Sequence, residues 1–269
     1  MGDVESTGRA EKESVSILPI DGIGNVGPGD PLEQMIGDAI AESVGELRWG
    51  DVVVVTHKIV SKAEGQLVDL GTVEPSPFAL DYAATWGKDP RQVEMVLRQS
   101  KRIIRMHRGI IIAETEHGFV CANAGVDASN AGQDMVCLLP RDPDASAARI
   151  LGALQGRFFP GAAAEDQPIG VIITDSFGRP WRNGIVNVAI GIAGISPLAD
   201  YRGQFDPDGY ELRASILAVG DELAAAAELV MHKIAMRPVA VIRGYERQPG
   251  PPSGTGQDLV MPEERNLFP

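Results

Sequence analysis

The chain has 269 residues, of which 44% are hydrophobic and 23% are charged, the balance of an ordinary globular protein. This length suits one large domain or two small ones, and it is enough to bury a core without support from disulfide bonds or bound metal ions. The 24 basic and 37 acidic residues give a formal net charge of −13, opposite in sign to a general nucleic-acid-binding protein. Two cysteines with no CxxC pair exclude a disulfide scaffold and a Cys/His zinc module.

The chain contains no apolar stretch that is long enough to cross a membrane. The longest, around Val188–Ile195, is interrupted by glycines and is far shorter than the roughly 20 residues of a spanning helix. Residues 1–16 are polar and lack the apolar core of a signal peptide, so we expect a flexible N-terminal tail. These features predict a cytoplasmic protein with neither a membrane nor a nucleic acid as partner.

Strand and helix patterns alternate along the first half of the chain. Ser16–Leu18 is expected to form a short strand, and the Asp30–Pro31 pair is expected to cap a helix that runs to about Val44. The run Asp51–Thr56 is β-branched and almost wholly apolar, which is typical of a buried strand. A helical section is expected over Pro77–Ser100.

The same alternation continues in the second half. Gly109–Ala113 and Gly118–Ala122 are expected to pair as a hairpin. Gly170–Thr174 has the composition of a second buried strand. The other expected elements are a helix at Asp144–Leu154, an extended segment at Tyr210–Val219, a helix at Asp221–Lys233 and a closing strand at Pro238–Arg243.

This mixture of strands and helices indicates an α/β or α+β fold. Neither an internal repeat nor a shift in composition marks a linker between domains, so we assign residues 17–247 to one domain. The segment 248–269 follows, and its first residues, QPGPPSGTG, are rich in turn formers. Its last part, Leu259–Pro269, regains apolar character, and we expect it to dock against the domain.

The segment Gly22–Gly27 matches GxGxxG, the dinucleotide-binding pattern. Three features count against that interpretation. The glycines run into prolines so that the helix starts late, Pro19 interrupts the preceding strand, and Asp51 lies at the start of the next strand instead of its end. The glycines then serve a turn, or a loop that packs a nucleotide base or ribose through its backbone. A dinucleotide-binding oxidoreductase remains an alternative.

The segment Thr56–Lys62 follows the first buried strand, at a position where loops often carry catalytic residues. Its two lysines and two hydroxyl side chains suit a phosphate group, although a solvated turn has the same composition. The chain has no GxxxxGK[ST] sequence, which excludes a P-loop.

Two further segments place a carboxylate after a strand. Asp127 lies in NAGVDASN, and Asp175 lies in ITDSFGRPWRNG. Carboxylate and hydroxyl oxygens together favour Mg²⁺ or Mn²⁺ over zinc, and Arg179 and Arg182 could clamp phosphate or carboxylate oxygens. Turn caps and surface ion pairs would explain the same residues, so spacing alone leaves both interpretations open.

Six blocks occur in order between about Ile17 and Gly244: ILPIDGIG…PGD, GDVVVVTHKIVSKAEG, ANAGVDASN, ITDSFGRPWRNG, GYEL…VGDELAAAAELV and PVAVIRG. Together they resemble the coenzyme F420-0:L-glutamate ligase family, the F420 γ-glutamyl ligases, and the terminal NLF is similar to the family's ending. The VD-x-SN and TD-x-x-GR-x-WRNG blocks are the most specific of these.

The resemblance implies a GTP-dependent amide ligase. It implies that L-glutamate is joined through its amine to the lactyl carboxylate of coenzyme F420-0 by way of an acyl phosphate, and that γ-linked glutamates follow. It also implies an intertwined homodimer with a distinctive two-subdomain fold of mixed sheets. Two divalent cations per site, Mg²⁺ or Mn²⁺, and a monovalent cation such as K⁺ would assist.

The resemblance also assigns roles by position. Asp127 and Asp175 match ligands of the first divalent cation, and Ser176 falls where the family places a hydroxyl residue on the second. Lys62 and Arg179 are expected to stabilise the charge that develops during phosphoryl transfer. The GTP-binding positions are Ile23, Gly24, Asn25, Val26, His57, Lys62 and Asn130.

Three departures from the family pattern concern these same regions. His57 stands where many relatives carry serine, and Gly24-Asn25 replaces a proline-containing pair. Lys233 falls where archaeal relatives place a carboxylate or amide that helps to bind the second cation. A charged lysine is no metal ligand, so water or backbone would have to complete that site.

Two alternatives accompany the resemblance. One is a ligase of the same build that acts on another carboxylate. The other is a catalytically silent binding or assembly protein, which the intact set of Asp127, Asp175 and Ser176 argues against.

Overall fold

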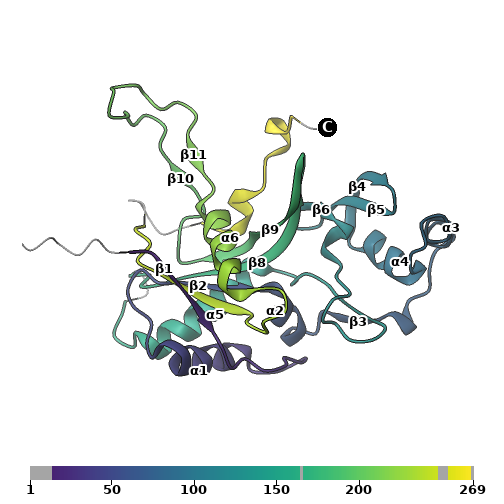
Figure 1. Ribbon diagram of the computed structural model, residues 1–269, viewed down its shortest axis with the longest axis horizontal. Coiled ribbons are helices and arrows are strands. Elements are labelled where there is room, and N and C mark those ends of the chain that lie inside the picture. The colour runs from purple at the N-terminus through teal and green to yellow at the C-terminus, as the bar shows by residue number, and fades with distance from the viewer. Residues whose placement is uncertain (1–13, 164–165, 248–253, 268–269) are drawn as a thin grey trace, which may run out of the picture.

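The computed structural model describes residues 14–163, 166–247 and 254–267, and a five-stranded mixed sheet lies at its centre (Figure 1). The strand order is β1-β12-β2-β8-β9, and only β2 and β8 run parallel to each other. The bounds are β1 Ser16–Ile20, β2 Val52–Thr56, β8 Gly170–Arg179, β9 Arg182–Ala193 and β12 Val239–Arg243.

Helices cover both faces of this sheet, which explains why β2 is apolar at every position from Val52 to Val55. Successive side chains of a strand point to opposite faces. Val53 and Val55 therefore pack with α1 (Leu32–Val44) and α5 (Pro143–Phe158), whereas Val52 and Val54 pack with α6 (Val219–Met231). The expectation of a buried strand is confirmed.

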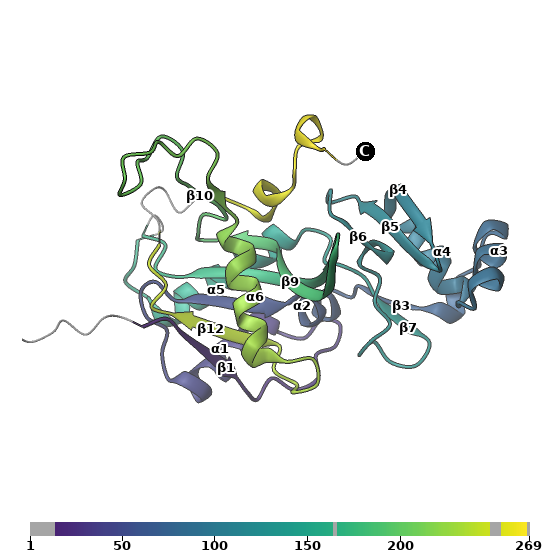
Figure 2. The same ribbon diagram turned by 45° about the horizontal axis from the view of Figure 1, so that its top comes forward.

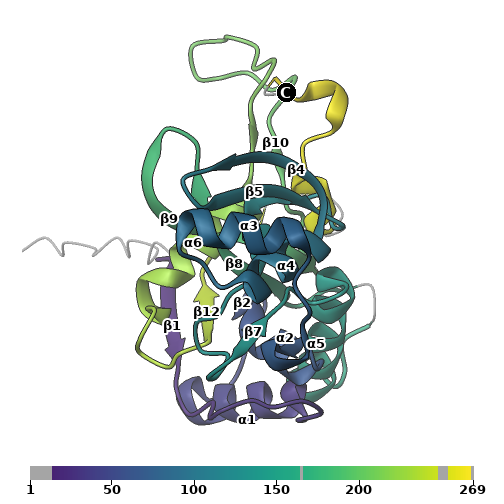
Figure 3. The ribbon, with the colours of Figure 1, turned by 90° about the vertical axis from the view of Figure 1, so that its right-hand side faces the viewer.

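A second group of elements lies beside the sheet and has hydrophobic clusters of its own (Figure 3). Two helices pack on a three-stranded antiparallel sheet of order β4-β5-β6. A two-stranded sheet, β3-β7, lies between this group and the large sheet (Figure 2). The bounds are β3 Leu67–Asp69, α3 Pro77–Trp86, α4 Pro90–Arg98, β4 Ser100–His107, β5 Ile110–Thr115, β6 Val120–Ala122 and β7 Met135–Cys137.

Short elements complete the described fold. Among them α2, His57–Ala63, continues directly from β2, where the sequence indicated only a loop or turn. The other short elements are the strands β10 Ala199–Asp200 and β11 Ile216–Leu217 and the 3₁₀ helices η1 Leu70–Thr72, η2 Asn123–Gly125, η3 Gly256–Leu259 and η4 Glu263–Arg265. Mixed sheets with helices on their faces confirm the α+β prediction at this level.

Several sequence predictions about elements need correction. Pro77–Ser100 is two helices, because Gly87 adopts a left-handed conformation, with φ 61°, and ends the first. Asp30 is no helix cap, since its carboxylate accepts a hydrogen bond from the amide of Gly27 at 2.8 Å and α1 begins at Leu32. The segment Tyr210–Val219 forms a strand only at Ile216–Leu217.

The two ends of the chain are described in part. The predicted N-terminal tail lies almost wholly outside the described residues. At the other end, Leu259 and Val260 pack against the hydrophobic cores on opposite sides of the large sheet, so the predicted docking holds at the start of the segment, while residues 261–267 are exposed. None of the helices in the described ranges has both the length and the apolar character that a membrane span requires.

Candidate functional site

A cavity of about 520 Å³ opens at the carboxyl ends of β2 and β8. Its walls come from six separate stretches of the chain, so the fold and not a single motif creates it. The polar and charged side chains that line it include Asn25, Lys58, Lys62, Asn130, Asp175, Ser176, Asn187, Glu228 and Lys233.

The first turn of α2 places charged side chains at the floor of this cavity. Thr56 keeps the extended conformation of β2, and the helix begins at the next residue. Lys58 and Lys62 are four residues apart, so they share a helix face, and both line the cavity. His57 points the other way and is fully buried, with Nδ1 3.2 Å from the hydroxyl of Ser61.

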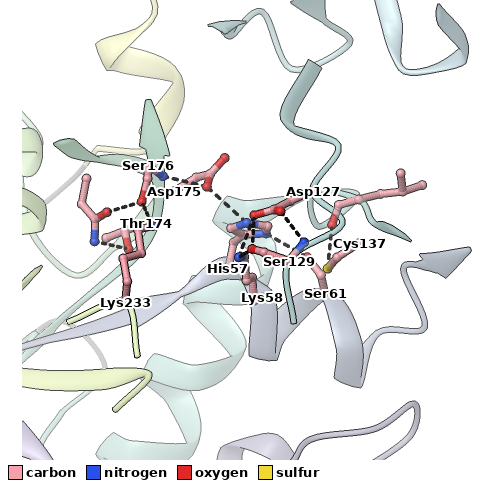
Figure 4. Close-up of polar contacts among 12 residues, drawn as sticks. His57, Lys58, Ser61, Asp127, Ser129, Cys137, Thr174, Asp175, Ser176 and Lys233 are labelled. Carbon is pink, nitrogen blue, oxygen red and sulfur yellow. Dashed lines mark hydrogen bonds and ion pairs between the residues drawn. The ribbon is translucent and has the colours of Figure 1, made fainter. Parts of the chain in front are cut away.

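Two aspartates from distant segments meet this turn of α2 (Figure 4). The Asp127 carboxylate accepts from Nζ of Lys58 at 2.6 Å. Oδ1 of Asp175 lies 3.2 Å from Nε2 of His57. The two carboxylates therefore contact consecutive residues of α2, His57 and Lys58.

The backbone of Asp127 is tied to β7, because its amide and carbonyl exchange hydrogen bonds with those of Cys137 at 3.0 and 2.8 Å. Ser129 donates to its carboxylate from the amide at 2.6 Å and from the hydroxyl at 2.9 Å. Burial acts to raise the pKa of Asp127, but the hydrogen bonds from Lys58 and Ser129 outweigh it and hold the pKa below its ordinary value. The carboxylate is therefore ionised at neutral pH.

Asp127 and Asp175 offer carboxylate oxygens that would hold a divalent cation once the Lys58 ammonium moves away from Asp127, whereas Ser176 offers only a neutral hydroxyl. Nε2 of His57 is buried and makes no hydrogen bond with the described residues, since its approach to Asp175 lacks the required alignment. A cation at Asp175 would give this nitrogen a partner. Nowhere in the described ranges do three acidic, histidine or cysteine side chains gather as a metal cage. Phosphate oxygens and water would complete the coordination, as is usual for Mg²⁺.

The surroundings of Ser176 are different. Asp175 and Ser176 lie within β8, which continues to Arg179 after a register shift at Ile173/Thr174. The Ser176 hydroxyl donates to Oδ1 of Asn187 at 2.7 Å and accepts from Nζ of Lys233 at 2.5 Å. An ammonium group therefore stands where a second cation would have to bind, so the described surroundings of this hydroxyl do not fit a divalent ion.

Comparison with known proteins identifies relatives of the whole chain. The chain matches the model of the F420-0:Gamma-glutamyl ligase family over residues 22–244. It is 44% identical to the coenzyme F420:L-glutamate ligase of Methanothermobacter thermautotrophicus, over 94% of this chain and 98% of that protein. The protein of the same name from Methanopyrus kandleri is 46% identical, over 90% and 93% of the two chains.

The chain belongs to the F420-0:γ-glutamyl ligase family. A third relative, the coenzyme F420:L-glutamate ligase of Methanocaldococcus jannaschii, is 40% identical over 81% of this chain and 84% of its own. The resemblance stated from sequence blocks is thereby confirmed.

Most of the positions that the family pattern assigned to nucleotide binding face the cavity. Ile23, Gly24, Asn25 and Val26 form one wall, and Lys62 and Asn130 belong to another. The glycine pattern at 22–27 does not open a helix, because α1 begins only at Leu32. This agrees with a loop that offers its backbone and argues against a dinucleotide fingerprint.

Arg179 is the exception among the predicted site residues. It lies at the end of the β8–β9 hairpin, is exposed and donates to the carbonyl of Asn183 at 3.2 Å. Four residues of extended strand separate it from Asp175, about 13 Å of chain. It does not line the cavity of its own chain, so its catalytic role stays a prediction.

Sequence reasoning missed two polar residues of the site, Asn187 and Glu228. Asn187 faces Ser176 across the β8–β9 pairing, and its amide donates to Glu228 on α6 at 3.0 Å. Lys58 was recognised only as one of two lysines that suit phosphate. The partners of Ser176 and Asp127 depend on strand register and helix position, which no local motif reveals.

Proposed function

We propose that the protein is a GTP-dependent ligase that joins L-glutamate to coenzyme F420-0 and then adds γ-linked glutamates. Its family and the names of its relatives support a ligase of this kind. The observation that carries the nucleotide-dependent part is the convergence of Asp127 and Asp175 on consecutive residues of α2, beside a cavity that Lys58, Lys62 and Lys233 line.

The positive side chains of this cavity suit a triphosphate even though the protein carries a net charge of −13. Lysine ammonium groups bind phosphate oxygens through charge-assisted hydrogen bonds. A cavity of about 520 Å³ is within the size range of small-molecule sites. Asn25 and Asn130 stand on its other walls and offer amide groups for the base or ribose.

The chemistry requires activation of a carboxylate, because its oxygen is a poor leaving group. In the first step the acceptor carboxylate oxygen attacks the γ-phosphorus of GTP, an acyl phosphate forms and GDP leaves. In the second step the amine of L-glutamate attacks the acyl carbon, inorganic phosphate leaves with the bonding electrons, and the amine proton is released. Positioning and neutralisation of charge are the main tasks of the protein.

The described residues divide these tasks. Asp127 and Asp175 would hold one divalent cation, Mg²⁺ or Mn²⁺, and that cation supplies neutralisation of phosphate charge when bound. Lys62 would stabilise the negative charge that develops on the transferred phosphoryl group. Nε2 of His57 lies on the buried side of Asp175 and would face the cation from there. A requirement for K⁺ belongs to the proposal and is tested by replacing K⁺ in the assay.

We also propose an intertwined homodimer of two-subdomain protomers, in the cytoplasm. The β8–β9 hairpin projects beyond the large sheet (Figure 2) and carries Trp181, which is 83% exposed, and Ile185. The segment between β10 and β11 also projects and exposes Phe205 and Tyr210. Exposed apolar side chains on projecting segments are typical of surfaces that a partner covers. Light scattering after gel filtration tests this directly.

One reaction tests the activity. The protein is incubated with GTP, Mn²⁺, L-glutamate and coenzyme F420-0, and the product mass is followed. We expect an increase by successive glutamyl units together with release of phosphate, and no product when ATP or GDP replaces GTP. Turnover of other carboxylates but not of F420-0 would show a different acceptor, and tight NAD(P)H binding without ligation would favour the oxidoreductase.

A further inference from the structure

Lys233 contacts Ser176 in the wall of the cavity. Lys233 follows the end of α6, where His232 adopts a positive φ of 54° and turns the chain toward the cavity. Its Nζ donates to the Ser176 hydroxyl at 2.5 Å. Both residues line the cavity, so this ammonium group faces the space in which the proposed triphosphate would bind.

The hydrogen bonds of Ser176 explain why the ammonium group is held there. A hydroxyl has one proton to donate and two lone pairs that accept. Ser176 donates its proton to Asn187, and Asn187 in turn is fixed by its bond to Glu228. Because its proton goes to Asn187, the hydroxyl oxygen keeps its lone pairs for other donors, and one of them accepts the hydrogen bond from Lys233.

A divalent ion on this oxygen would conflict with that arrangement. Mg²⁺ binds its ligands at about 2.1 Å, so an ion on the Ser176 hydroxyl would lie within a few ångströms of the Lys233 ammonium. Like charges at that separation repel each other strongly in a partly desolvated site. While Lys233 stays in contact with this oxygen, a second divalent cation is therefore disfavoured there.

We propose that Lys233 supplies, as a fixed ammonium, the positive charge that a second divalent cation would bring to the phosphates, so that the protein binds one divalent cation per site. The inference rests on the proposed function, because it assumes a triphosphate in the cavity. Lys58 and Lys62 line the opposite part of the same cavity, next to the carboxylates. The phosphates would then lie between one bound cation and lysines on two sides.

The experiment counts ions. The full-length protein is saturated with a non-hydrolysable GTP analogue and Mn²⁺, unbound ions are removed, and Mn²⁺ is measured per bound nucleotide. Electron paramagnetic resonance provides a second readout, because two ions about 4 Å apart give a coupled spectrum whereas a single ion does not. We expect one ion and an uncoupled spectrum for the unmodified protein.

Lys233→Gln tests whether the ammonium group is the cause. Removing it leaves the Ser176 hydroxyl, the Asn187 amide and the Glu228 carboxylate as oxygen donors. We expect this variant to bind a second Mn²⁺ and to give a coupled spectrum. With one equivalent of Mn²⁺ we expect its affinity for the analogue to fall about tenfold or more, as for loss of a charged hydrogen bond, and to recover with excess Mn²⁺.

Two controls separate charge from structure. Lys233→Arg keeps the positive charge and should keep one ion. Lys88→Gln removes an exposed lysine that does not line this cavity, and it should leave both ion count and affinity unchanged. Two ions in the unmodified protein, or one ion in Lys233→Gln, would overturn the inference. Failure of the unmodified protein to bind the analogue with Mn²⁺ would instead overturn the proposed function.

Discussion

Lys58 and Asp127 form an ion pair of 2.6 Å at the edge of the cavity, although they lie far apart in the sequence. The pair links α2, which continues the central strand β2, to the loop that precedes β7. Next to it, His57 contacts Asp175 from the buried side. The geometry of the cation site therefore depends on these two neighbouring contacts.

Asp127→Asn should abolish most of the ligase activity while leaving the fold intact. The amide keeps the size of the side chain but loses the charge that would bind the cation, and the side chain is 37% exposed, so no buried hole results. We expect kcat to fall at least about 100-fold, the range for losing one electrostatic group of a catalytic site. Product formation and circular dichroism check this together.

Asp38→Asn is the matched control for that variant. Asp38 also forms an ion pair, with Arg157 at 2.6 Å, but on the surface and away from the cavity. It should retain normal turnover. Unchanged turnover in Asp127→Asn would remove Asp127 from the site.

The lowered pKa of Asp127 predicts how stability depends on pH. A carboxyl whose pKa is lower in the folded state stabilises the fold above its unfolded pKa, about 3.9, and this contribution is lost as the pH falls through the folded value. The free energy of unfolding of the unmodified protein should therefore exceed that of Asp127→Asn most at neutral pH, and the difference should shrink below about pH 4. Urea denaturation at a series of pH values measures it, and a difference that grows on acidification would contradict the assignment.

Asp51→Ala should destabilise the fold without directly altering the cavity. Asp51 is fully buried and binds Arg243 through two parallel contacts, at 3.0 and 2.7 Å. Removing one partner of a buried pair costs about 3–5 kcal/mol, because the other charge is left uncompensated. The exposed pair of Asp200 and Arg202 has the same geometry, and Asp200→Ala should destabilise the fold far less, because water screens an exposed pair. Urea denaturation measures the free energy of unfolding of both variants, and equal losses for Asp51→Ala and Asp200→Ala would contradict this prediction.

Arg179 lies outside the cavity of its own chain, so in an intertwined dimer its predicted role has to be played in the cavity of the partner. Lys62→Ala and Arg179→Ala should each lower activity as separate homodimers. Mixed dimers contain one cavity with Lys62 from one protomer and Arg179 from the other, so co-refolding the two variants should raise activity. Full activity of Arg179→Ala alone would remove this residue from the chemistry.

Strands buried on both faces were predictable from composition, as β2 and β12 show. β4 was missed because its sequence, SKRIIRMH, mixes charged and apolar residues; only Ser100 lay in the expected helical section, and the residues after it were assigned to no element. It is a strand because it pairs with β5, and this pairing contains two irregularities of register. Contacts of that kind override local preference.

Some features of the site, like some elements of the fold, were predictable from the sequence and others were not. Asp127 and Asp175 were predictable because each follows an apolar strand segment in a polar block. The contacts of Ser176 with Asn187 and Lys233 were not, because they depend on how β8 pairs with β9 and where α6 ends. Side chains that come from three elements distant in sequence share no local pattern.

The direct passage from β2 into α2 has a consequence for the timing of catalysis. His57, Ile59, Val60 and Ser61 of α2 are buried against the core, so we expect this wall of the site to stay in place between turnovers. The wall that carries Lys233 is an irregular segment between α6 and β12 and lacks that constraint. Admission of a fresh nucleotide and departure of the spent one therefore depend on residues 232–238, and a cross-link across that segment would slow turnover by slowing product release.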